Sequence, residues 1–349
     1  MKKTLTKIIA CILSVSILCC FSSVVVFADN SASLADSPQS VANTITTIVN
    51  FINDIIKSIK LLFGIDDSEQ PSVPEEKGYA DVKEFGAYGD GVHDDAAAIQ
   101  KALDSLKNNG GTIYFPEGIY CISNCLIFYS NQHLDFENGA VIKRMALNNE
   151  KEPIELRYLL ASYTSAKLSE GRYNGTHDVV ISGATFDGNE EITTDSKITL
   201  FNLCHTSNVK ITGCSFVNGS LWHYIECNSS KDVLIDNCKF DATTYVEMRE
   251  DANEIIQIDG AKDGLYGPVY LANGKEMKFV KDNTPCVNIE ISNCEFICNG
   301  FAAIGCHKDF RHSNILIHDN VFKGEGEDSQ YIRFTESVVG VTEYNNIYE

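Results

Sequence analysis

The chain has 349 residues, of which 48 are Asp or Glu and 28 are Lys or Arg, so its formal net charge is −20 at pH 7. This excess of negative charge argues against nucleic acid as a partner. It also repels polyanionic sugars at long range, so an acidic polysaccharide would need local basic residues to hold it, and the bulk charge favours neutral glycans.

Residues 1–28 have the features of an export signal. Three lysines precede an apolar run from Ile8 to Val26, and Ala28 supplies a small residue suited to cleavage. A retained membrane anchor is the alternative, but the serines in the run and the cleavage site favour a signal peptide. We therefore expect a secreted protein, with association to the cell surface as the alternative.

Segment 29–65 is predicted to contain an amphipathic helix, because apolar residues recur with the spacing of one helical face from Ile45 to Phe63. This face would pack on the main domain or on a second copy of the chain, or attach the protein to a surface. Residues 66–79, which are acidic and contain prolines, are a predicted linker, and residues 80–349 form the main domain.

The main domain opens with GAYGDGVHDDAAAIQKAL at residues 86–103, followed by GGTIYFPEGIY at residues 110–120. Asp94 or Asp95 is expected to cap a helix that ends before the glycine pair and covers the open first coil of a solenoid. The string GDGVHDD could instead bind a metal, but turn and cap roles account for its residues. No metal site is predicted.

The decisive feature is an internal repeat. Six segments, HDVVISGATF, SNVKITGCSF, KDVLIDNCKF, VNIEISNCEF, SNILIHDNVF and VGVTEYNNIY, align without gaps. Their alternating apolar positions predict a strand with one face turned inward. The first apolar column holds Val179, Val209, Val233, Ile289, Ile315 and Val341, and the second holds Ile181, Ile211, Ile235, Ile291, Ile317 and the exception Glu343.

A turn follows each of these strands, in a column of residue types that tolerate a left-handed backbone: Gly183, Gly213, Asn237, Asn293, Asp319 and Asn345. The next column is rich in cysteine, and an aromatic column runs from Phe186 to Tyr348. Coils stacked about 4.8 Å apart would turn these columns into a cysteine ladder and an aromatic ladder. The cysteines outside the signal therefore resemble small buried residues rather than a disulfide framework.

The repeats are spaced 30, 24, 56, 26 and 26 residues apart. These intervals are too short for propeller blades and lack a helical period, which indicates a β-solenoid. The long interval is one coil with an insertion from about Gly260 to Cys286.

A second strand precedes each repeat. Alternation within these strands turns a row of side chains outward: Asn202, Glu226, Gln257, Asp259, Gly305, His307 and Arg333. A solvated sheet face would also be polar, but this row is dominated by groups able to act as acids, bases or hydrogen-bond partners. We predict that it is the substrate face.

Carboxyl groups in this row suit glycoside hydrolysis, which needs one protonated and one ionised carboxyl group beside the bond. If Glu226 aligns with Gln257, Asp259 lies one coil and two residues away, a backbone offset of roughly 8 Å that fits an inverting pair. Glu254 would crowd the pair and raise the pKa of one carboxyl group. Glu226, Asp259 and Glu254 are therefore candidate catalytic residues.

Other residues are candidates for supporting roles. His307, the fourth catalytic candidate, could donate to a sugar hydroxyl or tune a carboxylate, and a surface histidine is the alternative. Arg333 could clamp a uronate carboxylate or pair with nearby acids. The remaining candidates for substrate binding are Asn202, His223 and Gln257 on the strands and Tyr266 in the insertion.

The opening segment, residues 86–120, resembles the N-terminal signature of the pectate lyase superfamily that includes the rhamnogalacturonase- and epimerase-like proteins, and the ladders extend the resemblance over about residues 80–349. It implies an all-β fold, a right-handed single-stranded parallel β-helix with an N-terminal capping helix and substrate on the outer face of one sheet. That superfamily contains hydrolases, lyases, epimerases and phage tailspikes, so the signature is specific for fold rather than reaction.

Polygalacturonase-type hydrolases carry Asn-Thr-Asp, Asp-Asp, Gly-His-Gly and Arg-Ile-Lys on successive coils. Asn202, Asp259, His307 and Arg333 resemble parts of this pattern, but the paired Asp is absent and no Lys follows Arg333. This departure argues against polygalacturonase activity of the usual type. Lyases of the same fold use calcium held by clustered carboxylates and an Arg or Lys base, for which Arg333 is the candidate.

Three functional hypotheses follow. The first is a secreted glycoside hydrolase without a cofactor, acting on a polysaccharide through Glu226 and Asp259. The second is a lyase on uronate-containing chains that uses calcium. The third is a non-catalytic glycan-binding or surface β-helix in which the helix at residues 45–63 mediates self-association or attachment.

Overall fold

The computed structural model describes residues 78–145, 158–189, 199–219, 223–243, 254–262, 269–271, 274–298, 302–306, 310–324 and 331–349. The chain divides into two units, residues 1–73 and 74–349, and all described residues belong to the second. The predicted signal, the amphipathic helix and nearly all of the linker therefore lie outside the described residues. Within the described ranges, no helix is long and apolar enough to span a membrane.

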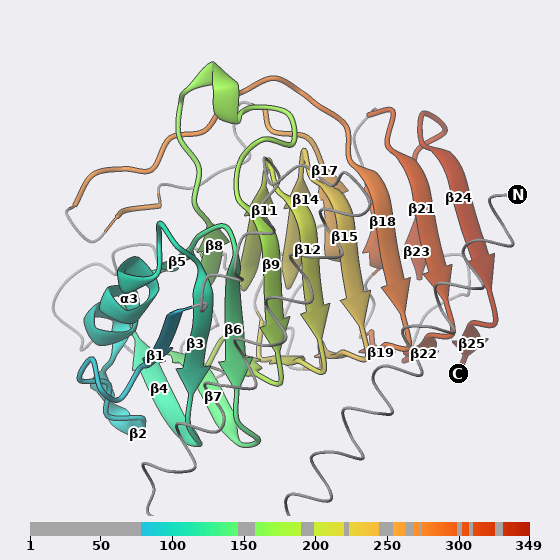
Figure 1. The fold of residues 1–349 in the computed structure, drawn as a ribbon. Helices are drawn as coiled ribbons and strands as arrows, with labels where there is room; N and C mark the ends of the chain where they lie inside the picture. The colour runs from blue at the N-terminus through green and yellow to red at the C-terminus, as the bar shows by residue number, and fades with distance from the viewer. Residues whose placement is uncertain are drawn as a thin grey trace, which may run out of the picture. The chain divides into compact units, whose positions relative to one another are not determined.

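The second unit is a coil built from three parallel sheets, which we call A, B and C (Figure 1). In each turn after the first, the chain passes through one strand of sheet A, one of sheet B and one of sheet C, and the strands of each sheet pair in parallel with their counterparts one coil further on. This arrangement confirms the predicted right-handed, single-stranded parallel β-helix.

Sheet A contains β1 (Gly78–Asp81), β3 (Gly111–Phe115), β6 (Gln132–Phe136), β9 (His177–Ser182), β12 (Ser207–Thr212), β15 (Lys231–Asp236), β18 (Val287–Ser292), β21 (Ser313–His318) and β24 (Val339–Tyr344). Sheet B contains β2 (Asp90–Asp94), β4 (Gly118–Ile122), β7 (Ala140–Arg144), β10 (Thr185–Asp187), β13 (Ser215–Val217), β16 (Lys239–Asp241), β19 (Glu295–Ile297), β22 (Val321–Lys323) and β25 (Ile347–Tyr348). Sheet C contains β5 (Leu126–Phe128), β8 (Leu160–Ser162), β11 (Phe201–Cys204), β14 (Ile225–Asn228), β17 (Glu254–Asp259), β20 (Ala302–Gly305) and β23 (Ile332–Arg333).

The interior is filled by the predicted ladders. The rings of Phe216, Phe240 and Phe296 stack with centroids 4.8 Å apart and planes 7° from parallel, and none of the three is exposed. The apolar columns of sheet A are in register across coils, as in the pairing of Val209 with Val233. Each coil contributes one large ring at the same position, and that ring is buried only because the rings of the neighbouring coils cover it.

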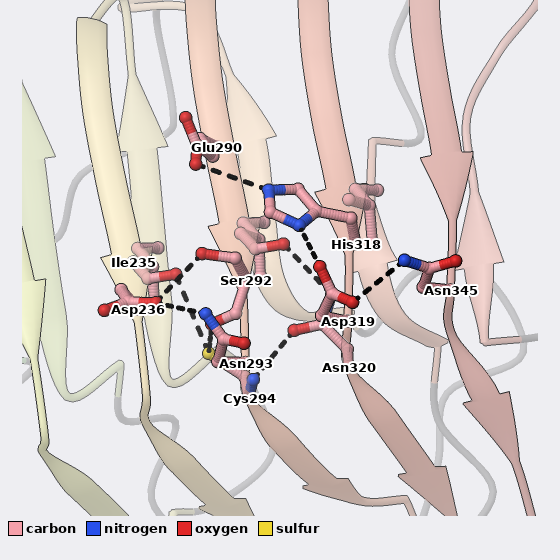
Figure 2. Close-up of polar contacts among 12 residues, drawn as sticks. Ile235, Asp236, Glu290, Ser292, Asn293, Cys294, His318, Asp319, Asn320 and Asn345 are labelled. Atoms are coloured by element: carbon pink, nitrogen blue, oxygen red, sulfur yellow. Dashed lines mark hydrogen bonds and ion pairs between the residues drawn. The ribbon is translucent and has the colours of Figure 1, made fainter.

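The turn from sheet A to sheet B adopts the expected left-handed backbone. Its φ values lie between 52° and 55° at Asn237, Asn293, Asp319 and Asn345. The side chains link successive coils: Asn293 Nδ2 donates to Asp236 Oδ1 at 2.8 Å, and Asn345 Nδ2 donates to Asp319 Oδ1 at 3.1 Å (Figure 2). Each coil is therefore fixed to the next by side-chain hydrogen bonds as well as by the sheets.

The cysteines after the signal are all free thiols, and all of them except Cys125 are buried. Cys214, Cys238 and Cys294 occupy the position just after the turn column, where the Cys238 N–H contacts Cys294 Sγ at 3.4 Å. These residues fill the corner of the coil, as the sequence predicts.

The predicted helix is α3 (Ala96–Ser105), and a short 3-10 helix, η1, spans Leu168–Glu170. Gln100 of α3 binds the free edge of β5, because its side chain donates to Ile127 O at 3.0 Å and accepts from Ile127 N at 2.8 Å. An amide side chain thus takes the place of a missing strand and closes sheet C at its first strand.

The capping prediction needs one refinement. Asp95 is at the N-cap position but makes no side-chain bond to the helix, and its carboxylate accepts instead from Tyr88 N and Gly89 N. Asp94 accepts from Ala96 N at 3.1 Å, so Asp94 supplies the side-chain hydrogen bond at the start of the helix.

Candidate functional site

The predicted row lies on sheet C in the expected register. Glu226 is the direct neighbour of Asn202 on one side and of Gln257 on the other. The row continues from Gln257 to Gly305 and from Gly305 to Arg333. Asp259 is two residues beyond Gln257 on the same face of β17, so the expected one-coil, two-residue offset from Glu226 is confirmed.

Glu226 is a buried carboxyl group with uncharged partners. Its Oε1 accepts from Thr199 Oγ1 at 3.1 Å, and its Oε2 accepts from Asn202 Nδ2 at 3.0 Å and lies 3.4 Å from Asn228 Nδ2. Only 2% of Glu226 is exposed. Burial raises its pKa to about 8, and the nearby charge of Asp259 adds to the rise, while the three hydrogen bonds oppose it. Glu226 is therefore mainly protonated at neutral pH.

A protonated Glu226 also accounts for Asn228. The Oδ1 atom of Asn228 is buried and has no hydrogen-bond partner among the described residues. Rotating the amide by half a turn would direct this acceptor at Glu226 Oε2 in place of Nδ2. A carboxylic acid at Glu226 supplies the O–H that this acceptor needs, whereas a carboxylate does not.

Asp259 has the opposite environment. Both of its carboxylate oxygens lie 2.9 Å from Lys262 Nζ, and Oδ1 also accepts from Gly260 N at 2.7 Å. Lys262 in turn lies 4.8 Å from the centroid of the Phe310 ring. A cation and a backbone N–H stabilise the charged form of Asp259, although only 1% of the residue is exposed.

Glu254 lies at the first position of β17, toward β23. Its Oε1 accepts from Arg333 at 2.8 Å, and its backbone carbonyl lies 2.6 Å from His223 Nδ1. A Cβ atom added to Gly305 would lie 2.1 Å from Arg333 O and 3.2 Å from Glu254 Cγ, so only glycine fits between them. Of the two roles considered for Arg333, the structure shows the pairing with a nearby acid.

The row is less open than expected for a substrate face. Asn202, Glu226, Gln257, Glu254 and Asp259 are each at most 3% exposed. The cations above them reach solvent, because the side chain of Arg333 is 44% exposed and that of Lys262 is 21% exposed. The face that the sequence predicts to be outward is thus a layer of buried carboxyl groups beneath two partly exposed cations.

Two candidates, His307 and Tyr266, lie outside the described residues. Three contacts of the buried carboxyl groups were not predicted: Thr199, Asn228 and Lys262. Asn228 could have been found, because it is two residues beyond Glu226 on the same strand face. Thr199 precedes β11 and Lys262 starts the insertion, where no strand period applies.

Groups that could bind a metal are already engaged in local structure. Asp90 binds His93 Nδ1 at 2.7 Å and the N–H groups of Val92 and His93. Among the described residues, no three His, Cys, Asp or Glu side chains are arranged to hold a metal ion. The three hydrogen bonds of Asp90 give it the turn role that the sequence predicts.

A second polar cluster, which the sequence reasoning missed, lies on the outer face of sheet A. His318 lies between two carboxylates, with Nδ1 2.7 Å from Asp319 and Nε2 3.3 Å from Glu290 (Figure 2). Its ring stacks on Tyr344 with the centroids 4.6 Å apart. Burial opposes the charged form, but the two carboxylates raise the pKa of His318 above its ordinary value.

Comparison with known proteins supports the fold and leaves the activity open. Residues 79–152 match the family model described as rhamnogalacturonase A/epimerase, pectate lyase-like. The plasmin and fibronectin-binding protein A of Streptococcus pneumoniae strain R6 is 31% identical over 194 residues, which cover 51% of this chain and 27% of that protein. The chain thus spans about a quarter of the length of this relative.

Solved structures extend the likeness beyond the family match. The crystal structure of PfbA, a surface adhesin of Streptococcus pneumoniae, has a TM-score of 0.60 and 26% identity, covering 78% of this chain and 62% of that one. An exopolygalacturonase from Thermotoga maritima has a TM-score of 0.51 and 17% identity, over 80% and 67% of the two chains, and shows the fold alone.

A shorter match is to the mannuronan C5-epimerase AlgE2 of Azotobacter vinelandii, which is 49% identical over 61 residues, 15% of this chain and 6% of that protein. The names of the matching sequences and the PfbA structure thus include an epimerase of mannuronan and a surface adhesin. The resemblance to the pectate lyase superfamily and its rhamnogalacturonase- and epimerase-like proteins is thus confirmed, by the family model over residues 79–152 and by the fold over the described coils.

Proposed function

We propose that this protein is an extracellular polysaccharide-active enzyme, a glycoside hydrolase in which Glu226 is the proton donor and Asp259 the ionised partner. One observation carries the proposal: of two neighbouring carboxyl groups on sheet C, Glu226 has uncharged hydrogen-bond partners and Asp259 is bound by a lysine. Glu226 has neutral partners and a pKa of about 8, whereas Asp259 is bound by Lys262. Such separation of protonation states is how an active site assigns acid and base roles to two carboxyl groups.

The spacing of the two residues supports an inverting reaction. One strand spacing and two residues along the strand give a backbone offset of roughly 8 Å. Inverting enzymes hold their carboxyl groups about 6.5 to 9.5 Å apart, which leaves room for the attacking water. In this scheme Glu226 would protonate the leaving oxygen, and Asp259 would take a proton from that water once Lys262 moves aside.

Substrate would meet the two cations first. Arg333 and Lys262 are partly exposed above carboxyl groups that are almost fully buried. Each is paired with a buried carboxyl group, so the two cations offset local negative charge on a protein with a formal charge of −20 and lessen its repulsion of an acidic sugar. Since Glu226 is 2% exposed, the proposal requires the side chains above it to move when the sugar binds.

A second candidate is a surface protein that binds a glycan or a protein without turnover. The likeness to the plasmin and fibronectin-binding protein A, described as a surface adhesin, favours it and also supports an extracellular location. In this case the ion pairs of Glu254 with Arg333 and of Asp259 with Lys262 would be structural.

One assay separates these functions. The protein is incubated with a panel of neutral and uronate polysaccharides, with calcium or with a chelator, while new reducing ends and ultraviolet absorbance are measured together. A hydrolase gives reducing ends without absorbance, and Asp259→Asn should abolish them while the exposed control Glu84→Gln should not. Absorbing products that depend on calcium would instead identify a lyase. Binding without products would favour the adhesin-like function.

A further inference from the structure

The insertion after β17 contains a segment that lies back across earlier coils. We call residues 274–286 the strap; the insertion is drawn in orange in Figure 1 and passes over the green part of the chain. One side chain just beyond each of three successive sheet C strands donates to a strap carbonyl. These bonds are Thr164 Oγ1 to Lys278 O at 2.9 Å, His205 Nε2 to Val280 O at 2.6 Å, and Ser229 Oγ to Thr284 O at 2.7 Å.

His205, the middle contact, is fully buried and uses both ring nitrogens. Nε2 lies 2.6 Å from Val280 O, and Nδ1 lies 2.7 Å from Arg172 O. A carbonyl oxygen can only accept, and a neutral imidazole has a single N–H. Both contacts are hydrogen bonds only when each ring nitrogen carries a proton. In a neutral ring, one nitrogen lone pair would face a carbonyl oxygen at less than 3 Å, which is repulsive.

The charges around His205 agree with a positive ring. Asp282 of the strap accepts from Arg172 N at 2.7 Å, beside the carbonyl that His205 contacts. Burial alone would raise the pKa of Asp282, but the N–H groups of Arg172 and Thr284 lower it, and the nearby His205 contributes to the lowering. Asp282 of the strap is therefore a charged side chain that interacts with His205.

The other two of these three contacts, and the bond from Tyr173 Oη to Pro285 O at 2.7 Å, do not depend on pH in the same way. Hydroxyl groups, such as those of Thr164 and Ser229, donate at any pH near neutrality. Only the number of N–H groups on His205 changes over the range in which an imidazole titrates. His312 also contacts the strap, as the acceptor of Cys286 N, but burial lowers its pKa to about 4, so it stays neutral over this range. Of the three side chains that donate to strap carbonyls from the ends of the sheet C strands, His205 is the one whose bonding changes with protonation.

We propose that His205 is a pH-sensitive clamp that holds the strap on the coil when doubly protonated and releases it when the ring loses a proton. Release would expose the ends of β8, β11 and β14, and with them the rim of sheet C beside Asn228. The strap is thus closed at low pH and opens as pH rises. This device does not depend on which polysaccharide, if any, the protein cleaves.

Hydrogen exchange between pH 5 and 8 tests the clamp in the full chain. The reporter is the Arg172 amide, whose acceptor is the strap residue Asp282, and the reference is the Ile211 amide in the β12 ladder. After correction for the intrinsic pH dependence of exchange, opening at Arg172 should increase by up to about tenfold per pH unit, because opening releases one proton. Opening at Ile211 should stay constant.

Two variants then test whether the pH dependence of exchange at Arg172 comes from His205. His205→Gln should remove the pH dependence at Arg172, and the matched control His177→Gln, at an exposed histidine, should keep it. A pH-independent Arg172 amide in the unaltered protein, or a dependence that survives His205→Gln, would overturn the clamp. If His205→Gln does not fold, nitrogen NMR of the unaltered ring at pH 5 decides: two protonated nitrogens support the clamp, and a single protonated nitrogen overturns it.

Discussion

Replacing Glu226 with Gln is expected to stabilise the protein, and the gain should grow as pH rises. The pKa of Glu226 is about 8 in the folded protein, against an ordinary value of 4.5. Between these values the unfolded chain gives up the Glu226 proton while the folded chain keeps it, so the unaltered protein loses stability with increasing pH. The free energy of unfolding should fall by about 1.4 kcal/mol per pH unit, or about 5 kcal/mol over the whole interval.

The variant keeps part of the contacts that the acid makes. A Gln side chain with its oxygen at the Oε1 position accepts from Thr199, and its NH2 group at the Oε2 position can donate to a rotated Asn228 amide, but it no longer accepts from Asn202. Urea unfolding at half-unit steps from pH 4.5 to 8 should show the difference between variant and unaltered protein widening, with Glu84→Gln showing no such trend. A constant difference would mean that Glu226 ionises normally and would refute the assignment of the acid.

Further predictions concern the ion pair, the ladders and the sheet A cluster. Lys262→Met leaves Asp259 buried without its cation and should cost about 3 kcal/mol in urea unfolding; adding Asp259→Asn should recover most of the loss, and no recovery would argue against direct pairing. Phe240→Ala should cost about 3 to 5 kcal/mol in the same assay, because it removes a fully buried ring from the stack; a loss below 1 kcal/mol would contradict the ladder. Asn237→Val should cost about 1 to 2 kcal/mol and Asn237→Gly little, because φ is 52° at this residue. Equal costs would show that the left-handed backbone does not determine which residues are tolerated there. His318→Gln should lower the melting temperature at pH 5 and change it little at pH 9, because the two carboxylates that raise the pKa of His318 stabilise the fold only while the ring is charged. A larger loss at pH 9 than at pH 5 would contradict this.

The sequence predicts the coil and the register of the row because both depend on local periods. The two-residue alternation in each strand and the recurring turn column determine which side chains face inward. The alignment of Glu226 with Gln257, which the sequence argument takes as its condition, is confirmed by the strand pairing. Side chains that repeat once per coil must stack, so the aromatic ladder follows from the same alignment.

Contacts made by irregular segments could not be predicted from the sequence periods. Lys262 and the strap belong to an insertion without a period, so neither the pairing of Lys262 with Asp259 nor the two carbonyls on His205 could be read from spacing. The burial of the row also depends on what lies above it, and strand alternation shows only which face a side chain is on. The sequence therefore predicts which groups share a face but not their exposure or their charge partners.

The most direct test of the proposed chemistry compares two leaving groups. On the polysaccharide that the panel identifies, Glu226→Gln should lower turnover by about 10²- to 10⁴-fold, because the leaving oxygen needs a proton. On the corresponding glycosyl fluoride, whose leaving group needs no proton, the same variant should keep most of its activity, while Asp259→Asn should lose activity on both substrates. Equal loss on both substrates by Glu226→Gln, or no loss on either, would contradict the role of Glu226 as the proton donor.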